Sequence, residues 1–455
     1  MQQPRNLKGL FEILLVIGII LAIPLFFVIR SQAQAAEPTA TMVWPTNTPQ
    51  GVGGAMTAAA PTPAPSEMPV VATGKEPPAC SFPLAQTRIM VSQSETYTFS
   101  KPQVVLTVKQ PIHVYQWLPD NQRALIGEET NPGESVAIFN TQTGKIQVFG
   151  SRGSASDGPP AWVTSLNAVI YPRTAVTGSQ LMISRGDPAN IQLLDELKST
   201  SNTPRFFAGV KPDGSQLIYL GGSDKQLHNR NISQGALGAV QSHPFDISQW
   251  TYRNPAPVFR MAWRPGSTQV FLYSNEFGNY TFLLDVNTGQ VCELNLFGKE
   301  DSNDWRKSWV MTGHWSPNGR FLAVVRTKGG LPIDFSDLLV LDTVTGKLYQ
   351  TDATKFGPSD LDPQGKHFIS DVAWAPDNQH LAVIGRVDSA GGKSTSPIDR
   401  LFLLDFLGGK AVQVSSDELG PNFETNLLWS SDGSKLMVMC PNGLCLLSVQ
   451  KGVQP

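Results

Sequence analysis

The chain is poor in the residues from which most catalytic and metal sites are built. Its 455 residues include only four cysteines and six histidines, and the histidines are scattered. A structural zinc site needs about four Cys or His ligands, and neither residue is spaced here to supply them. The sequence also lacks a G-x-S-x-G elbow, an H-E-x-x-H helix, a P-loop and a G-x-G-x-x-G turn. It therefore predicts no cofactor and favours a protein that is not an enzyme.

The charge balance argues against a nucleic-acid partner. The chain carries 35 Lys and Arg against 37 Asp and Glu, for a net charge of -2, and charged residues make up 16% of it. A nucleic-acid-binding domain instead gathers basic side chains on one face. Two acidic stretches, at 301–304 and 360–362, lack the twelve-residue loop and closing Glu of a calcium site. We interpret both as solvated loops and expect no metal ion.

The one long apolar run of the chain lies within residues 1–30. It extends from Leu10 to Ile29, with Glu12 as its only charge. At about 1.5 Å per residue, a helix of this length spans roughly 30 Å, the thickness of a bilayer core. We therefore expect residues 1–30 to form a single transmembrane helix that acts as a signal-anchor in the cell membrane.

The charges around this run predict its orientation. Arg5 and Lys8 precede it, and after Arg30 no Lys or Arg occurs before Lys75. Positive charge favours the cytoplasmic side, so the N-terminus is expected inside and the bulk of the chain outside. The alternative is a signal peptide cleaved near Ala35, which would release a secreted protein.

Residues 31–84 have the composition of a disordered, flexible linker. Nine prolines between Pro38 and Pro78 alternate with Ala, Thr and Gly. Such a segment cannot bury enough apolar surface to fold. In an extended polyproline II conformation it would reach about 150 Å. It would therefore hold the following domain away from the membrane.

A strand–turn–strand pattern recurs along residues 85–455. In its best copy Trp315 ends one strand, Ser-Pro-Asn-Gly makes a tight turn, and Phe321–Val325 has strand composition. Seven residues occupy the Trp place, at intervals of 45 to 59 residues: Trp117, Trp162, Val210, Trp263, Trp315, Trp374 and Trp429. Near-regular repetition on this scale indicates a repeat array.

A second turn lies between apolar runs in most repeats. Its copies begin with Asn or Asp and end with Gly, as in Asn140–Gly144, Asp285–Gly289, Asp342–Gly346 and Asp405–Gly409. Each is the turn of a further hairpin, so one repeat carries about four strands. Four-stranded units in a radial array are the blades of a β-propeller. We predict an all-β, seven-bladed propeller with four-stranded antiparallel blades over residues 85–455.

The W-x-P-D-G-x-x-L-A pattern resembles the PD40, or TolB-like, version of the WD40-like propeller repeat. Trp374–Ala382 and the repeat at Trp315 match it well, whereas the repeats at Trp162 and Val210 are degenerate. The Gly-His and Trp-Asp pairs of WD40 repeats proper are missing. The resemblance implies the fold but says little about function, because propellers host many unrelated activities.

Ring closure and the cysteines give two further expectations. Little chain follows the last repeat, so residues from about 87 to 108 are expected to supply the outer strand of the last blade. Cys440 and Cys445 flank a tight turn, which predicts a disulfide in an oxidising compartment; two buried thiols are the alternative. Cys80 and Cys292 are too far apart in sequence to pair by inspection.

One pattern predicts a ligand site. The residue three places before each anchor lies near the start of the presumed innermost strand of its blade. It is apolar in the first three blades (Val114, Pro159 and Phe207) and polar in the last four (Arg260, Thr312, Asp371 and Asn426). If this phase faces the axial channel, part of the wall is polar, as a ligand site requires. Alternatively, these groups satisfy one another or a column of waters. His314 and the blade tryptophans are interpreted as structural.

These observations favour a membrane-anchored, extracytoplasmic propeller that acts as a non-catalytic protein-interaction or scaffold module. Its partner would be an unidentified protein of the cell envelope. The long excursions Thr327–Asp337 and Asp388–Arg400 leave adjacent blades on one face and are the expected binding surface. The alternative is a ligand- or glycan-binding receptor, or a lyase-type enzyme, that uses the channel mouth.

Overall fold

The computed structural model describes only part of the chain, all of it within the second of two compact units, Met68–Pro455. The described residues are 79–81, 95–108, 110–130, 133–153, 158–175, 178–186, 190–198, 207–220, 226–233, 235–244, 259–274, 281–294, 296, 308–328, 335–356, 366–388, 398–414, 419 and 427–453. The expected membrane span, most of the linker and Asn426 therefore lie outside them. Among the described residues no helix is long and apolar enough to cross a membrane.

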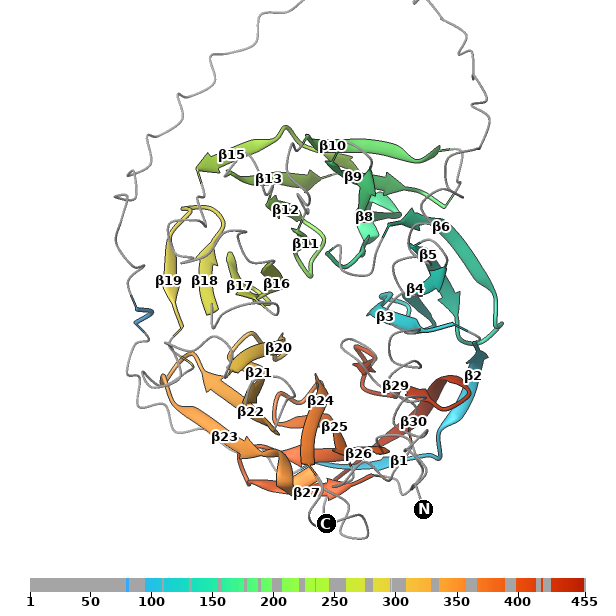
Figure 1. The fold of residues 1–455 in the computed structure, drawn as a ribbon, viewed down its shortest axis with the longest axis vertical. Coiled ribbons are helices and arrows are strands. Elements are labelled where there is room, and N and C mark those ends of the chain that lie inside the picture. The colour runs from blue at the N-terminus through green and yellow to red at the C-terminus, as the bar shows by residue number, and fades with distance from the viewer. Residues whose placement is uncertain are drawn as a thin grey trace, which may run out of the picture. The chain divides into compact units, whose positions relative to one another are not determined.

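Seven antiparallel sheets are arranged in a ring (Figure 1), as the repeats predict. The first three blades are β3 (Ile112–Trp117), β4 (Arg123–Thr130), β5 (Gly133–Asn140) and β6 (Ile146–Arg152); β7 (Ala161–Val163), β8 (Ala168–Ala175), β9 (Gly178–Ser184) and β10 (Gln192–Lys198); and β11 (Phe207–Val210), β12 (Gln216–Leu220), β13 (Gln226–Ser233) and β15 (Gln241–Pro244), with β14 (Ala236–Leu237) paired to β13. The 3₁₀ turn Thr164–Leu166 joins β7 to β8.

The next three blades follow the same order. They are β16 (Phe259–Trp263), β17 (Gln269–Ser274), β18 (Thr281–Asp285) and β19 (Val291–Glu293); β20 (Ser308–Trp315), β21 (Phe321–Lys328), β22 (Phe335–Asp342) and β23 (Leu348–Asp352); and β24 (Lys366–Trp374), β25 (His380–Asp388), β26 (Ile398–Asp405) and β27 (Lys410–Gln413). A 3₁₀ turn at Ala353–Phe356 follows β23. The anchor residue ends the first strand in each of these blades, as the pattern predicts.

The seventh blade closes the ring with strands from both ends of the described chain. It consists of β28 (Leu428–Trp429), β29 (Lys435–Cys440), β30 (Gly443–Val453), β1 (Glu95–Phe99) and β2 (Gln103–Thr107). Both β1 and β2 pair antiparallel with β30, from Glu95 opposite Val453 to Thr107 opposite Gly443. The prediction that an N-terminal segment closes the last blade is confirmed, with two strands in place of one.

The turns explain why the sequence folds this way locally. In the turn after the first strand, Gly214, Gly319 and Gly433 have positive φ, and Asn121 and Asn378 adopt the same conformation. Glycine and asparagine tolerate this region best. We call the face that carries these turns and the Asx-to-Gly turns the turn face. The opposite face, where β21 leads to β22 and β25 to β26, is the loop face.

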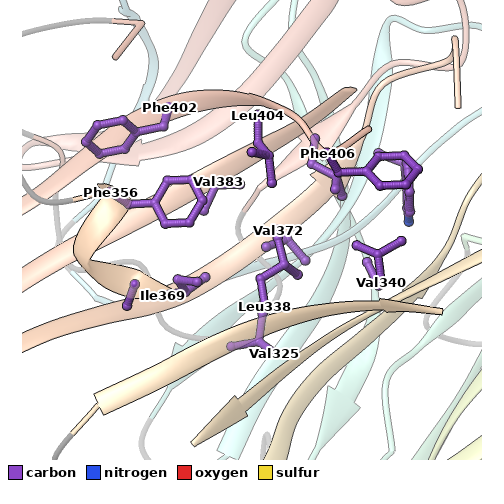
Figure 2. Packing of buried hydrophobic residues seen from close by; sticks show 14 of the residues in the cluster. Val325, Leu338, Val340, Phe356, Ile369, Val372, Val383, Phe402, Leu404 and Phe406 are labelled. Atoms are coloured by element: carbon purple, nitrogen blue, oxygen red, sulfur yellow. The ribbon is translucent and has the colours of Figure 1, made fainter. Parts of the chain in front are cut away.

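The core is divided into seven apolar clusters, one between each pair of neighbouring blades. Figure 2 shows the cluster between blades 5 and 6, where Leu338 and Val340 of β22 approach Val372 of β24. Each anchor tryptophan belongs to the cluster on the side of the preceding blade; Trp374, for example, packs with Phe321. The expected packing of tryptophans between blades is therefore confirmed.

Two disulfides occur in the described chain. Cys80 is joined to Cys292 of β19, and Ala79 forms a parallel bridge with Glu293, so the end of the linker is fastened to the outer edge of blade 4. Cys440 is joined to Cys445, across the β29–β30 turn. These two are not directly opposite one another, because Cys440 pairs in register with Gly443. The first pairing could not be predicted because it joins residues 212 positions apart.

Candidate functional site

Two of the predicted channel residues lie on the innermost strands of adjacent blades. Thr312 is on β20 and Asp371 is on β24, and each strand has a register shift just before the residue. A Cβ at Gly313 would lie 2.5 Å from Phe271 of blade 4, so the Gly313 face of β20 is turned toward blade 4. Because side chains alternate along a strand, Thr312 and His314 are turned the other way, toward blade 6.

His314 connects Thr312 to Asp371. The Thr312 Oγ1 lies 2.6 Å from the His314 Nε2, and this Nε2 lies 4.0 Å from the Asp371 Oδ1. The His314 side chain is 31% exposed, whereas that of Asp371 is 1% exposed. The cluster is therefore a buried carboxylate beneath a partly exposed imidazole, at the junction of blades 5 and 6.

Backbone N–H groups hold the Asp371 carboxylate in place. Its Oδ1 accepts a hydrogen bond from the Val372 N–H at 2.8 Å, and its Oδ2 accepts one from the Leu427 N–H at 3.0 Å. The second bond connects blade 6 to the entry of blade 7. A buried carboxylate needs such donors because burial otherwise penalises its charge.

Burial sets the charge of His314. Desolvation lowers its pKa from the ordinary value of 6.5 to about 4, so the imidazole is neutral at pH 7. A neutral imidazole has one N–H donor and one acceptor nitrogen. Thr312 and Asp371 both approach the Nε2, whereas in a nucleophile–base–acid relay the hydroxyl and the carboxylate contact opposite ring nitrogens. The geometry is that of a polar cluster and does not match a hydrolase triad.

The other predicted positions are distributed differently. Arg260 is half-buried on β16, in register with Tyr273. Val114 is fully buried in the apolar cluster between blades 7 and 1, whereas Pro159 is exposed. Asn426 and the side chain of Phe207 lie outside the described residues. The structure therefore groups Thr312 with Asp371 through His314, and ligand binding by any of the four polar residues stays a prediction.

His314 is the residue that sequence reasoning assigned to structure alone. Its carbonyl oxygen does have a structural role, since it accepts a hydrogen bond from the Trp374 indole at 2.9 Å. Its side chain, however, is the exposed member of the cluster. The sequence could have placed His314 beside Thr312, because it lies two residues later and must share the same face of the strand.

Buried ion pairs lie at the base of the two predicted binding loops. The Arg326 Nη2 donates to the Asp337 Oδ2 at 2.8 Å, across β21 and β22. Arg386 and Asp399 form a two-point contact at 2.7 and 3.1 Å, across β25 and β26. Both aspartates are almost fully buried.

The observed strands include both ends of each predicted excursion. Thr327 and Asp337 already lie in β21 and β22, and Asp388 and Arg400 lie in β25 and β26. The chain between these strands, residues 329–334 and 389–397, lies outside the described residues. The predicted excursions are therefore too wide at both ends, because the hairpins extend beyond the turn-like residues that marked the boundaries.

Blade 1 carries a third buried ion pair close to the same face. The Arg152 Nε donates to the Glu134 Oε2 at 2.8 Å, and the Tyr115 hydroxyl donates to the Glu134 Oε1 at 2.6 Å. Burial is the largest influence on Tyr115 and raises the pKa of its phenol well above the ordinary value. A Cβ at Gly127 would lie 1.3 Å from the Glu134 Oε1, so the glycine makes room for this carboxylate.

In the described part of the chain no group of three or more His, Cys, Asp or Glu side chains is placed to hold a metal ion.

Of the comparisons with known proteins, only the one with solved structures finds similar proteins. No protein-family model and no curated sequence matches the chain. Similar structures include the β-propeller domain of Cps50 (Swd1) from Myceliophthora thermophila, at 10% identity and TM-score 0.48 over 78% of this chain and 100% of that one. An oligogalacturonate lyase from Vibrio parahaemolyticus has 11% identity and TM-score 0.44 over 79% and 98% of the two chains. Hydrazine synthase from Kuenenia stuttgartiensis has 13% identity and TM-score 0.45 over 81% and 100%.

Proposed function

We propose that this chain is a membrane-anchored, extracytoplasmic β-propeller that binds a protein partner of the cell envelope through its loop face and performs no catalysis itself. The observation that carries the proposal is the pair of buried Arg–Asp contacts beneath the β21–β22 and β25–β26 connections. The charged pair lies near the loop end of each hairpin, two register pairs from that end in blade 5 and one in blade 6. Side-chain exposure is 6% and 3% in blade 5 and 12% and 1% in blade 6.

Such pairs contribute little net stability to a hairpin. Desolvation of two charges often outweighs their attraction, so an apolar pair of similar size would serve stability as well. What a two-point Arg–carboxylate contact adds is a defined geometry. A binding loop with a fixed base loses less conformational entropy when a partner docks.

The two loop bases are also joined to one another. Ser336, next to Asp337 on β22, lies within hydrogen-bond distance of the backbone of Ile369 on β24, with its Oγ accepting from the Ile369 N–H at 2.5 Å. Ile369 pairs in register with Gly385 of β25, next to Arg386, so β24 lies between the two hairpins and links them into one platform on adjacent blades. A platform of this kind supports a binding surface that spans both blades, as expected for a protein partner.

The location outside the cytoplasm rests on the N-terminal apolar run and on the cysteines. All four cysteines are paired, and disulfides persist in oxidising compartments. The Cys80–Cys292 pair would fasten the linker to the ring, so that the membrane anchor connects to blade 4.

A comparison of loop variants tests the proposal. Residues 329–334 and 388–397 are each replaced by Asn-Gly, which suits a two-residue hairpin turn. The control variant, T143K/T288K, changes exposed turn-face residues. Both full-length proteins and the wild type are expressed in the native membrane, and their co-purified proteins are quantified. We expect one envelope protein to be retained by the wild type and the control and lost from the loop variant. Equal recovery from all three would contradict the proposal.

A polar ligand at the channel is the second candidate function. The Thr312–His314–Asp371 cluster favours it, because a neutral imidazole is partly exposed above a fixed carboxylate. Under this alternative the loop variant would still bind the polar ligand, and H314A would not bind it.

A further inference from the structure

Two cavities flank one arginine on the turn face between blades 4 and 5. The larger, of ≈ 450 Å³, is lined by the blade 4 turn residues 264–269 together with Asp285 and Asn318. The smaller, of ≈ 280 Å³, is lined by Cys80, Ser81, Leu283, Cys292, Thr343 and Val344. Arg264 and Gln269 line both. Neither cavity belongs to the channel cluster or to the loop face.

The described contacts of the Arg264 guanidinium are all to neutral groups. Its Nε donates to the Gly319 carbonyl at 2.7 Å, its Nη1 to the Gln269 Oε1 at 2.6 Å, and its Nη2 to the Thr343 Oγ1 at 2.9 Å. It also lies 5.3 Å from the centre of the Trp315 ring. Three of its five N–H groups are thereby used. Within the described ring it forms no ion pair, and burial lowers its pKa.

Blade 4 is unusual at this turn. In five of the other six blades the turn carries a carboxylate or amide that accepts backbone N–H groups, as Asp120, Asp213, Asn318, Asp377 and Asp432 do. Blade 4 has Gly266 at the place that follows Pro265. Lys211, which matches Arg264 in blade 3, pairs with its turn carboxylate Asp213 at 3.1 Å. In blade 4 the place of that carboxylate is taken by Gly266, which lines the larger of the two cavities beside Arg264.

The smaller cavity is the better anion site. Asp285 lines the larger cavity and would repel an anion there. Among the described residues that line the smaller cavity, Arg264 is the only charged one, and Leu283, Val344 and the Cys80–Cys292 disulfide form apolar walls. A cavity of about 150 Å³ holds benzene, so ≈ 280 Å³ has room for an aromatic ring with a short acidic arm.

We propose that the smaller cavity binds the carboxylate of a small apolar acid, with Arg264 as the anion-binding group and the Cys80–Cys292 disulfide as one wall. A carboxylate there would accept charge-assisted hydrogen bonds from the guanidinium and would compensate a partly desolvated cation. The same chemistry is presented by a free aryl or branched-chain acid and by the C-terminal residue of a protein.

The test uses full-length protein in detergent and 4-fluorophenylacetate as the probe, followed by ¹⁹F NMR titration. 4-Fluorophenylacetamide, which has the same shape without the charge, is the matched control ligand. The peptide Gly-Gly-Phe with a free C-terminus and its amidated form are then tested as competitors that displace the fluorinated probe. This comparison distinguishes a protein C-terminus from a free acid as the source of the carboxylate. We expect the acids to bind and both amides to bind at least about tenfold more weakly.

Three variants locate the site. R264Q removes the cation, and V344W fills the cavity while leaving Arg264 and its three contacts in place. K211Q changes the matching turn of blade 3. We expect the first two to weaken binding of the acid at least about tenfold and K211Q to leave it unchanged. Equal binding of acid and amide, wild-type affinity in either R264Q or V344W, or no binding of either acid probe would overturn the proposal.

Discussion

The indole Nε1 of Trp374 in blade 6 donates a hydrogen bond to the carbonyl oxygen of His314 in blade 5 at 2.9 Å. The same contact joins Trp315 to Ala262 and Trp117 to Leu428, one blade back in each case. In these three blades the anchor tryptophan therefore does two things: it fills the apolar space between blades and connects the innermost strands.

This contact predicts that two of the tryptophans contribute differently to the free energy of unfolding. The Trp429 Nε1 is buried and has no acceptor among the described residues. W374F should lower the free energy of unfolding by about 1 kcal/mol more than W429F, because W374F removes a hydrogen bond, whereas W429F removes a buried N–H that has no acceptor among the described residues. Urea denaturation at pH 7.5 measures the difference. An equal loss in both variants would show that the indole hydrogen bond adds nothing to packing.

Ring closure by β2 can be tested at one glycine. A Cβ at Gly443 would lie 2.1 Å from the backbone oxygen of Leu106, whereas a Cβ at Gly144 would meet nothing within 4 Å. Both glycines have positive φ, so both substitutions to alanine cost about 1 kcal/mol from backbone strain. G443A should cost several kcal/mol more, because β2 must move. If thermal denaturation gives the same loss for G443A and G144A, β2 does not pair at this position.

The two disulfides should differ in their contribution to stability. Cys80–Cys292 closes a span of 212 residues and Cys440–Cys445 a span of 5. In the chain-entropy account the longer loop is worth about 5 kcal/mol and the shorter about 2 kcal/mol. C80A/C292A should therefore lower the free energy of unfolding more than C440A/C445A, as measured by denaturant titration. The reverse order would contradict the fastening of the linker to blade 4.

His314 predicts a pH dependence of stability. Its pKa is about 4 in the folded protein and 6.5 in the unfolded chain, so below pH 6.5 the unfolded chain takes up the proton first. Stability should therefore be unaffected by this group above pH 6.5, fall between pH 6.5 and 4 by about 1–3 kcal/mol, and level off below pH 4.

H314Q provides the comparison for this prediction. The difference in unfolding free energy between the wild type and H314Q isolates the imidazole from other titrating groups. A difference that is constant between pH 7.5 and 4 would show that His314 titrates normally and is not desolvated.

The repeat pattern was sufficient to predict the ring but not everything attached to it. Trp117, Trp315 and Trp374 end the innermost strands as expected, because Pro-Asx turns and alternating apolar residues are local signals. The Cys80–Cys292 pair has no local signal, since its two residues are 212 positions apart in the sequence.

The predicted channel residues show a second limit of prediction from the sequence. Thr312 and Asp371 both approach the His314 Nε2, but both are buried, and the first strands of blades 5 and 6 contain register shifts next to them. A shift of one residue changes which face a side chain occupies. Such a bulge cannot be read from spacing alone, and it leaves His314 as the exposed residue.

Site-specific photo-crosslinking in the native membrane tests the proposed function most directly. A benzophenone amino acid is placed at Leu331, between β21 and β22 in the sequence, and at Ala390, between β25 and β26. Thr143 and Thr288 on the turn face serve as control positions. Our account predicts that one envelope protein is crosslinked from both loop-face positions and from neither control. Crosslinks to that protein from the turn face, or none from Leu331 and Ala390, would contradict binding through the loop face.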